Sequence, residues 1–162
     1  MAPTETDKDS RHAICPLNLP PGDVRLRRSA RGDEVYDPLR RKWLLLTPEE
    51  WVRQHFTSFL RTHLGYPASL MGNEIAIKLN GTSKRCDSVV HDHAGKPLMI
   101  VEYKAPSVTI TQEVFDQIAR YSLVLNVRYL VVSNGLHHYC CRLEPECDKY
   151  TFLREIPHYD QL

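Results

Sequence analysis

The segment from Asp87 to Lys104 constrains the fold most, because its pattern places three charged side chains on one small area of a β-sheet. Two apolar runs in this segment are separated by residues 91–97, a turn-forming stretch with Ala94-Gly95 at its centre. Side chains alternate between the two faces of a strand, so Glu102 and Lys104 share one face. A turn with this centre also sets Asp87 opposite Glu102, with the two Cβ atoms roughly 5 Å apart.

Two carboxylates at this separation repel each other, and strands ordinarily avoid like charges at opposite positions. A divalent cation removes the conflict, because Mg²⁺ prefers oxygen ligands and is commonly held by one or two carboxylates with water and phosphate oxygens. Lys104 supplies a positive charge that can orient a water molecule and offset charge on a phosphoryl oxygen. The competing interpretation is an exposed ion pair on the wet face of a strand. The apolar run before Glu102 favours a functional site, since unpaired buried charges are costly.

A second hairpin brings in a third acidic residue. Residues 74–79 alternate between polar and apolar, and the Asn80-Gly81 that follows is a strong signal for a two-residue hairpin turn. That turn sets Glu74 opposite Asp87, so that Glu74, Asp87 and Glu102 form a row across three neighbouring strands. Lys78 on the same strand favours a solvent-exposed face instead, and a one-residue change of register would destroy the row.

Two helices are predicted. Thr47 at the N-cap, Pro48 at N1 and Glu50 at N3 form a capping box that starts a helix ending near Leu64. A second capping box at Thr109-Ile110-Thr111-Gln112 starts a helix that runs to about residue 126. The apolar stripe of this second helix includes Val114, Ile118, Tyr121 and Leu125.

The predicted order of elements is α-β-β-β-α-β-β, an α/β (α+β) domain with a mixed sheet. Residues 129–133 are nearly all apolar and are predicted as a buried strand, parallel to residues 99–104 through the helix crossover. An outer strand over 136–143 and a short edge element over 149–154 follow. Residues 24–28 and 34–46 are predicted as an N-terminal hairpin. We expect a flexible arm over residues 1–20, the domain over 21–145 and a tail over 146–162.

The composition is that of a globular protein, with 42% hydrophobic and 25% charged residues. No apolar run reaches the roughly 18 residues needed to span a membrane, and the first residues lack the pattern of a secretion signal. We therefore expect a cytoplasmic protein. Five cysteines without C-x-x-C spacing argue against a disulfide framework and a zinc site. Residues 24–42 hold seven basic against three acidic residues, which indicates either phosphate binding or a solvated hairpin.

These elements in this order resemble the PD-(D/E)XK nuclease superfamily, in its RecB-like branch. The closer resemblance is to the N-terminal nuclease-like domain of type I restriction enzyme R subunits, over roughly residues 17–145. The chain departs from the superfamily motif in carrying Cys86 where the motif has proline. It contains no G-x-x-x-x-G-K-[ST] loop, so ATP-driven translocation is excluded for this chain alone. The resemblance is carried by Pro38-Leu39-Arg40, Thr47-Pro48-Glu49-Glu50-Trp51-Val52-Arg53-Gln54, Lys84-Arg85-Cys86-Asp87, Ile100-Val101-Glu102-Tyr103-Lys104-Ala105-Pro106 and Ser133-Asn134-Gly135.

The resemblance implies a role for each residue that matches the motif. Asp87 and Glu102 would hold Mg²⁺, for which Mn²⁺ could substitute, and the backbone carbonyl of Tyr103 would be a further ligand. Lys104 would position the attacking water.

For four further residues, the resemblance implies a role in the site, and a structural role is an alternative for most of them. Gln117 and Tyr121 match a Q-x-x-x-Y helix motif whose residues contact DNA or support the site, although core packing also explains Tyr121. Glu50 matches an acid on the first helix of the superfamily, but its place in the capping box is a structural alternative. Glu74 belongs either to the metal site or to a wet strand face.

The predicted function is therefore that of a metal-dependent DNA nuclease, an (endo)deoxyribonuclease with little intrinsic sequence specificity, of the kind found in restriction-modification systems; the sequence leaves endonuclease or exonuclease action open. DNA is the expected partner, and another chain would supply a motor or specificity subunit; the oligomeric state is left open. The first alternative is a non-catalytic or partner-dependent DNA-binding module of the same fold. The second is RNA cleavage, or another role in nucleic-acid metabolism, at the same site.

Overall fold

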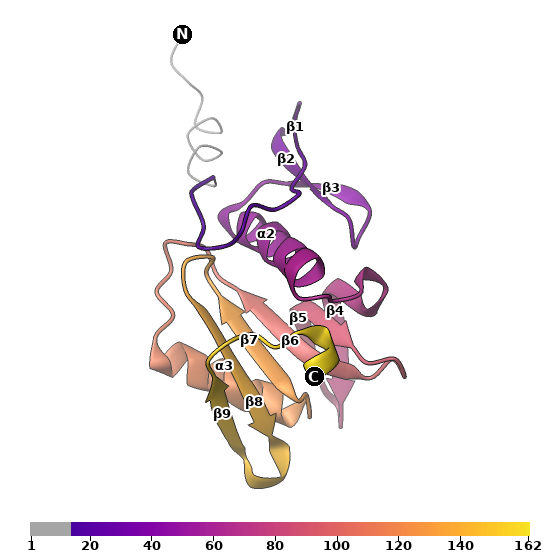
Figure 1. Ribbon diagram of the computed structural model, residues 1–162, viewed down its shortest axis with the longest axis vertical. Helices are drawn as coiled ribbons and strands as arrows, with labels where there is room; N and C mark the ends of the chain where they lie inside the picture. The colour runs from indigo at the N-terminus through magenta and orange to yellow at the C-terminus, as the bar shows by residue number, and fades with distance from the viewer. Residues whose placement is uncertain (1–13) are drawn as a thin grey trace.

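The computed structural model describes residues 14–162, and these residues form two β-sheets and two α-helices (Figure 1). Most of the predicted arm, residues 1–13, lies outside the described residues. The central sheet has six strands in the order β4-β5-β6-β7-β8-β9. Its strands are β4 (Met71–Leu79), β5 (Thr82–His91), β6 (Pro97–Tyr103), β7 (Tyr129–Ser133), β8 (His138–Glu144) and β9 (Lys149–Leu153), and the helices are α2 (Pro48–His63) and α3 (Gln112–Val124). Short 3₁₀ turns occupy Ala68–Leu70, Pro145–Cys147 and Tyr159–Gln161.

The central sheet is antiparallel except for β6 and β7, which are parallel and joined through α3. Met99 pairs with Tyr129 and Val101 with Val131. The predicted helix crossover, the order of elements and the mixed sheet of an α/β (α+β) fold are confirmed. The edge element predicted after residue 148 is β9, which pairs with β8.

The two hairpins that carry the acidic residues have the predicted register. Asn80 and Gly81 both have positive φ, 48° and 79°, as a two-residue turn that matches the twist of the strands requires. This turn sets Ile77 opposite Lys84. In the next hairpin Ser88 lies opposite Val101.

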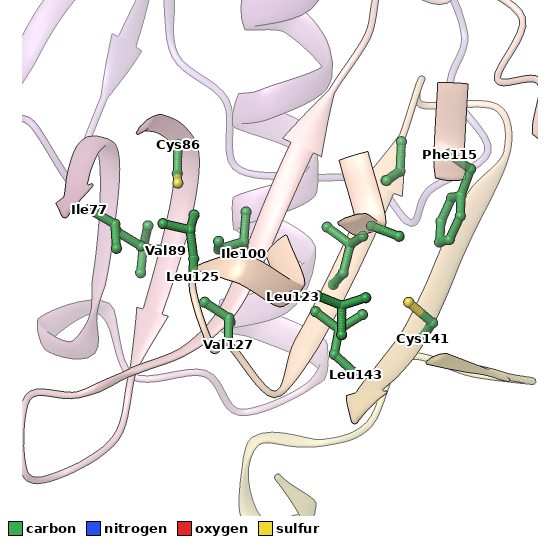
Figure 2. Close-up of a cluster of buried hydrophobic side chains, with 13 residues drawn as sticks. Ile77, Cys86, Val89, Ile100, Phe115, Leu123, Leu125, Val127, Cys141 and Leu143 are labelled. Carbon is green, nitrogen blue, oxygen red and sulfur yellow. The ribbon is translucent and has the colours of Figure 1, made fainter. Parts of the chain in front are cut away.

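The helices cover opposite faces of the central sheet, which therefore has a hydrophobic core on each side (Figure 1). Burial on both faces explains why β6 and β7 are nearly continuous apolar runs. The core under α2 includes Val52, Phe56, Leu60, Val101, Tyr103 and Val131. The core under α3 includes Phe115, Ala119, Leu123, Ile100, Leu130 and Val132, and part of it is drawn in Figure 2.

Helix α2 begins as predicted. The Thr47 hydroxyl accepts a hydrogen bond from the Glu50 N–H at 3.1 Å, and Pro48 occupies the first turn, where its missing N–H costs nothing. Gly65, with φ 72°, follows the end of the helix. Only half of the predicted capping box forms, because the Glu50 carboxylate contacts arginine side chains.

Helix α3 differs from the prediction in its cap and in its buried face. The N-cap is Thr111, whose hydroxyl accepts from the Val114 N–H, so the helix starts at Gln112. The face turned to the core carries Phe115, Ala119 and Leu123. Of the predicted stripe residues, Leu125 is buried in this core, and Ile118 and Tyr121 lie at its margin, partly buried. Phe115 causes the rotation, because its ring packs against the aromatic rings of Tyr150 and Phe152 in β9.

The smaller sheet consists of β1 (Leu26–Ser29), β2 (Gly32–Asp37) and β3 (Lys42–Leu45). The predicted continuous strand over 34–46 is wrong, because the chain turns after Asp37. The Asp37 carboxylate accepts hydrogen bonds from the N–H groups of Leu39 and Arg40, and the intervening Pro38 has no N–H to offer a strand partner. Figure 1 shows this sheet beside α2, on the side away from the central sheet.

The segments before β1 and after β9 contact α2 and the loop between β7 and β8. The indole N–H of Trp51 donates to the carbonyl of Cys15, and the N–H of Asn18 donates to the carbonyl of Gly135. At the other end, Tyr159 donates its N–H to the carbonyl of Leu64. Residues 15–20 and 156–162 therefore make ordered contacts with the folded part of the chain.

Candidate active site

Asp87 and Glu102 lie where the ladder between β5 and β6 ends. The paired residues run only as far as Ser88 and Val101. Beyond that point the N–H of Tyr103 donates to the Asp87 Oδ2 atom at 2.9 Å, so the carboxylate takes the place of a main-chain acceptor. The structure thus brings Asp87 and Glu102 together, as the hairpin register predicts.

In strand β4, next to Asp87, the side chains do not alternate regularly between the two faces of the sheet. In β4, Met71 belongs to the core under α2, but Ile75 and Ile77 pack in the core under α3. Regular alternation would place all three on one face. The interruption coincides with Glu74, which has φ 57° and is missing from an otherwise continuous set of strand pairs. A positive φ is uncommon for a residue with a side chain.

Strand β5 shows the same change of face. Cys86 and Val89 both pack in the core under α3, although they are three residues apart (Figure 2). Asp87 therefore lies at the crossover between the two faces. The row of three acids predicted from regular alternation does not form, because Glu74 is directed to Arg53 on α2.

Glu102 is buried, with 8% of its surface exposed, on the face of the sheet that α3 covers. Burial and the neighbouring Asp87 charge raise the pKa of Glu102 to about 7. Lys84 Nζ lies 2.6 Å from Glu102 Oε1. This ion pair acts against the upward shift of the Glu102 pKa, which burial and the Asp87 charge produce.

Lys104 directly follows the last residue of β6. Its main-chain N–H donates to the carbonyl of Ser133 on β7 at 2.9 Å, which fixes the backbone at the end of the strand. Its side chain is half-buried and forms no ion pair with any residue of the described chain. The Lys104 ammonium therefore lies beyond ion-pair distance of the Glu102 carboxylate.

Arg53 of α2 is a buried cation on the other side of Asp87. Its guanidinium donates to Glu74 Oε1 at 2.7 Å, lies 3.1 Å from Glu50 Oε1 and lies 3.7 Å from Asp87 Oδ1. These carboxylates, with an opposing effect from burial, raise the pKa of Arg53. Arg85 forms a second ion pair with Glu74 at 3.0 Å. Glu50 and Glu74, the two acids assigned with alternatives, thus both contact Arg53.

A chain of buried polar groups connects the site to the smaller sheet. The hydroxyl of Tyr103 donates to Ser88 Oγ at 2.9 Å, and Ser88 donates to the side-chain oxygen of Asn73 at 2.5 Å. Asn73 donates to Asp37 at 2.9 Å, and Arg40 also donates to Asp37. These groups satisfy one another, as buried polar groups must. The network supports Tyr103 from the α2 side of the sheet.

The two residues of the Q-x-x-x-Y motif have different surroundings. Tyr121 donates its hydroxyl to the carbonyl of Ser83 at 2.9 Å, and its ring lies 5.1 Å from Lys84 Nζ. Its ring also packs at the margin of the core under α3, so core packing and site support both apply. Gln117 is exposed on the same helix, one turn earlier.

The site contains oxygen donors that suit a small hard cation. In the described part of the chain, no three His, Cys, Asp or Glu side chains gather as a metal-binding group. The available donors are the carboxylates of Asp87 and Glu102, and one or two carboxylates with water are sufficient for Mg²⁺. The two acids lie next to each other at the end of the β5–β6 ladder, and Glu102 is buried, so their mutual repulsion fits a cation at this position.

Sequence reasoning missed Arg53 and Lys84, the two cations that flank the acidic pair. Both lie inside the motif segments quoted above, but neither has a distinctive spacing. For Lys84 a signal existed, because the Asn80-Gly81 turn sets it opposite Ile77, on the strand next to Glu102. For Arg53 the signal is its place on α2 beside Val52 and Phe56, where a charged side chain on a buried face needs partners.

The mixed sheet, the helix crossover and the acids at the end of the β5–β6 ladder define a restriction-endonuclease-like α/β domain. The chain belongs to the family of the type I restriction enzyme R protein N terminus, whose family model matches residues 48–157. The matched region begins with α2 and includes every strand of the central sheet. No curated protein matches the chain. Among the described residues, no helix is long and apolar enough to cross a membrane.

Proposed function

We propose that this chain is a Mg²⁺-dependent DNA nuclease that hydrolyses phosphodiester bonds at Asp87, Glu102 and Lys104. The observation that carries the proposal is the pair of adjacent carboxylates at the end of the β5–β6 ladder, one of them buried. Two adjacent carboxylates, one of them buried, are unfavourable unless a cation balances them. Membership of a restriction enzyme family supports DNA as the substrate.

Each residue of the site has a chemical task in this proposal. Asp87, Glu102 and the Tyr103 carbonyl would hold Mg²⁺, which supplies Lewis acidity and a more acidic bound water. Lys104, whose ammonium pairs with no described carboxylate, would orient the attacking water and offset charge on the phosphate. Attack of water on phosphorus breaks one P–O bond and leaves an alcohol end and a phosphate end.

The proposed partners are DNA and a further subunit. Two exposed arginines lie close to the face of the Trp43 ring, Arg25 just before β1 and Arg27 in β1, and Arg27 also pairs with Glu34. Phosphate contacts from such side chains give affinity without sequence choice. A motor or specificity subunit on another chain would direct the nuclease to its substrate.

A second candidate is a DNA-binding module of the same fold that does not cleave. It is favoured by Arg53 and Lys84, because these side chains already place a positive charge beside Asp87 and Glu102. Such a module would bind DNA equally well with and without divalent cation.

The test is cleavage of supercoiled and linear DNA, and of RNA in parallel, with Mg²⁺, Mn²⁺ or EDTA. The wild type is compared with Lys104→Ala and with Lys96→Ala, a matched change at an exposed lysine in the turn after β5. The proposal expects metal-dependent DNA cleavage that is lost in Lys104→Ala and kept in Lys96→Ala. DNA binding without cleavage by folded wild type would favour the binding module, and preferential digestion of RNA would change the substrate.

A further inference from the structure

Lys84, which no motif assigns to the site, forms the ion pair with Glu102 that the E-x-K pattern suggests for Lys104. Its Nζ atom lies 2.6 Å from Glu102 Oε1, whereas the Lys104 side chain has no ion pair within the described residues. The Lys84 side chain is only 21% exposed. Lys84 is therefore a largely buried partner of Glu102 and not a solvated surface lysine.

Three neighbours determine where the Lys84 ammonium lies. Strand β5 places Lys84 on the α3 side of the sheet, the side on which Cys86 is buried, and from there its side chain reaches Glu102 in β6. The ring of Tyr121 lies 5.1 Å from Nζ, a distance at which the ring face attracts a cation. The Tyr121 hydroxyl also donates to the carbonyl of Ser83, which ties α3 to the residue before Lys84.

The two acids of the site are therefore each flanked by a cation of the chain, on opposite faces of the sheet. Arg53 lies beside Asp87 on the α2 face, and Lys84 lies beside Glu102 on the α3 face. Glu102 and Asp87 also interact with each other. Attraction by Lys84 to one oxygen of Glu102 thus limits how the carboxylate can rotate relative to Asp87.

We propose that Lys84 is a positioning residue of the nuclease site: it holds Glu102 in the orientation that faces Asp87, and Tyr121 holds Lys84. This inference rests on the proposed nuclease function. Groups that orient a metal-binding side chain are commonly worth about 10- to 100-fold in affinity or activity. We expect Lys84→Met to lower the cleavage rate by this factor.

The first experiment measures single-turnover cleavage at saturating Mg²⁺ and DNA for wild type, Lys84→Met and Lys84→Arg. Lys78→Met is the matched control, because Lys78 is an exposed lysine of the neighbouring strand β4. We expect Lys84→Met to cleave about 10- to 100-fold more slowly. Its affinity for DNA should stay within about threefold of wild type, since Lys84 faces Glu102 rather than solvent. Lys84→Arg should recover most of the rate, and Lys78→Met should match wild type.

A second experiment needs no activity. Thermal unfolding without metal is measured for wild type, Lys84→Met, Glu102→Gln and the double variant. Removing Lys84 leaves a buried carboxylate without its cation, so the midpoint should fall by about 3 to 6 °C. In the Glu102→Gln background the same change should shift the midpoint by less than about 1 °C, because there is no charge left to hold.

The outcomes separate this inference from the proposed function. If Lys84→Met binds DNA more weakly but cleaves at the wild-type rate, Lys84 is a phosphate contact. If Lys84→Met needs less Mg²⁺ and cleaves at the wild-type rate, Lys84 only competes with the metal. Either result overturns the inference. The inference is also overturned if Lys84→Met shifts the unfolding midpoint equally in the wild-type and Glu102→Gln backgrounds. If folded wild type does not cleave DNA, the proposed function fails, and the thermal cycle alone decides whether Lys84 holds Glu102.

Discussion

Replacement of Arg53 by methionine should destabilise the fold measurably, because it removes a cation that three acidic side chains share. The Arg53 guanidinium lies within ion-pair distance of Glu50, Glu74 and Asp87, and the side chain is 6% exposed. Removing one member of a buried ion pair costs about 3–5 kcal/mol when the partner is left uncompensated. Methionine keeps much of the volume, so the loss reports mainly on charge.

The expected loss is smaller than that limit, because each of the three carboxylates keeps a second donor. We therefore expect about 2 kcal/mol, which corresponds to a fall of about 4 to 8 °C in the unfolding midpoint for a chain of this size. The remaining donors are Arg40 for Glu50, Arg85 for Glu74 and the Tyr103 N–H for Asp87.

Urea unfolding followed by circular dichroism at neutral pH measures this loss. Arg120→Met is the matched control, because Arg120 is an exposed arginine on α3, and it should change the free energy of unfolding by less than about 0.5 kcal/mol. Adding Glu74→Gln to Arg53→Met should recover part of the loss, since it removes one of the three acidic charges that Arg53 balances and leaves only the Arg85 contact to be lost. Arg53→Met with the stability of the control would refute the account of Arg53 as the shared cation.

Three further changes test the account elsewhere in the fold. Burial lowers the pKa of His138, so its neutral ring contributes stability above the unfolded-state pKa of 6.5, and this stability is lost as the pH falls below that value. The free energy of unfolding should therefore fall less between pH 7.5 and 5.5 in His138→Gln than in wild type. The control is His137→Gln, at an exposed histidine, which should lose as much unfolding free energy over this range as wild type does. Thr47→Ala should cost about 1 kcal/mol in urea unfolding through loss of the helix cap, and an unchanged midpoint would contradict that role. Gly72→Ala should cost about 1–3 kcal/mol, because an added Cβ would lie 2.8 Å from the Ile75 side chain, and the cost should shrink in an Ile75→Ala background.

The arrangement of the central sheet follows from local signals. Asn80-Gly81 determines one register and the turn near Gly95 determines the next, so the adjacency of Asp87 and Glu102 could be predicted from turn chemistry alone. The apolar runs at residues 99–103 and 129–133 predicted the parallel pair, because a strand buried on both faces needs no alternation.

The features that the sequence did not indicate depend on contacts between distant residues. The positive φ of Glu74 cannot be seen in a pattern that alternates cleanly from 74 to 79, and it is supported by ion pairs from Arg53 on α2 and Arg85 on β5. The buried face of α3 was predicted about one position away, because Phe115 packs against aromatic residues of β9, more than thirty residues later in the sequence. Local periodicity contains no information about such partners.

The most direct test of the central claim is single-turnover cleavage of DNA in saturating Mg²⁺ by wild type and by Glu102→Gln, which keeps the shape of the side chain and removes its charge. Glu113→Gln, a change at an exposed acid in the first turn of α3, is the control. The account predicts cleavage that EDTA abolishes, a loss of about 100-fold or more in Glu102→Gln, and an unchanged rate in the control. Cleavage by Glu102→Gln at the wild-type rate would contradict the claim that Asp87 and Glu102 form the active site.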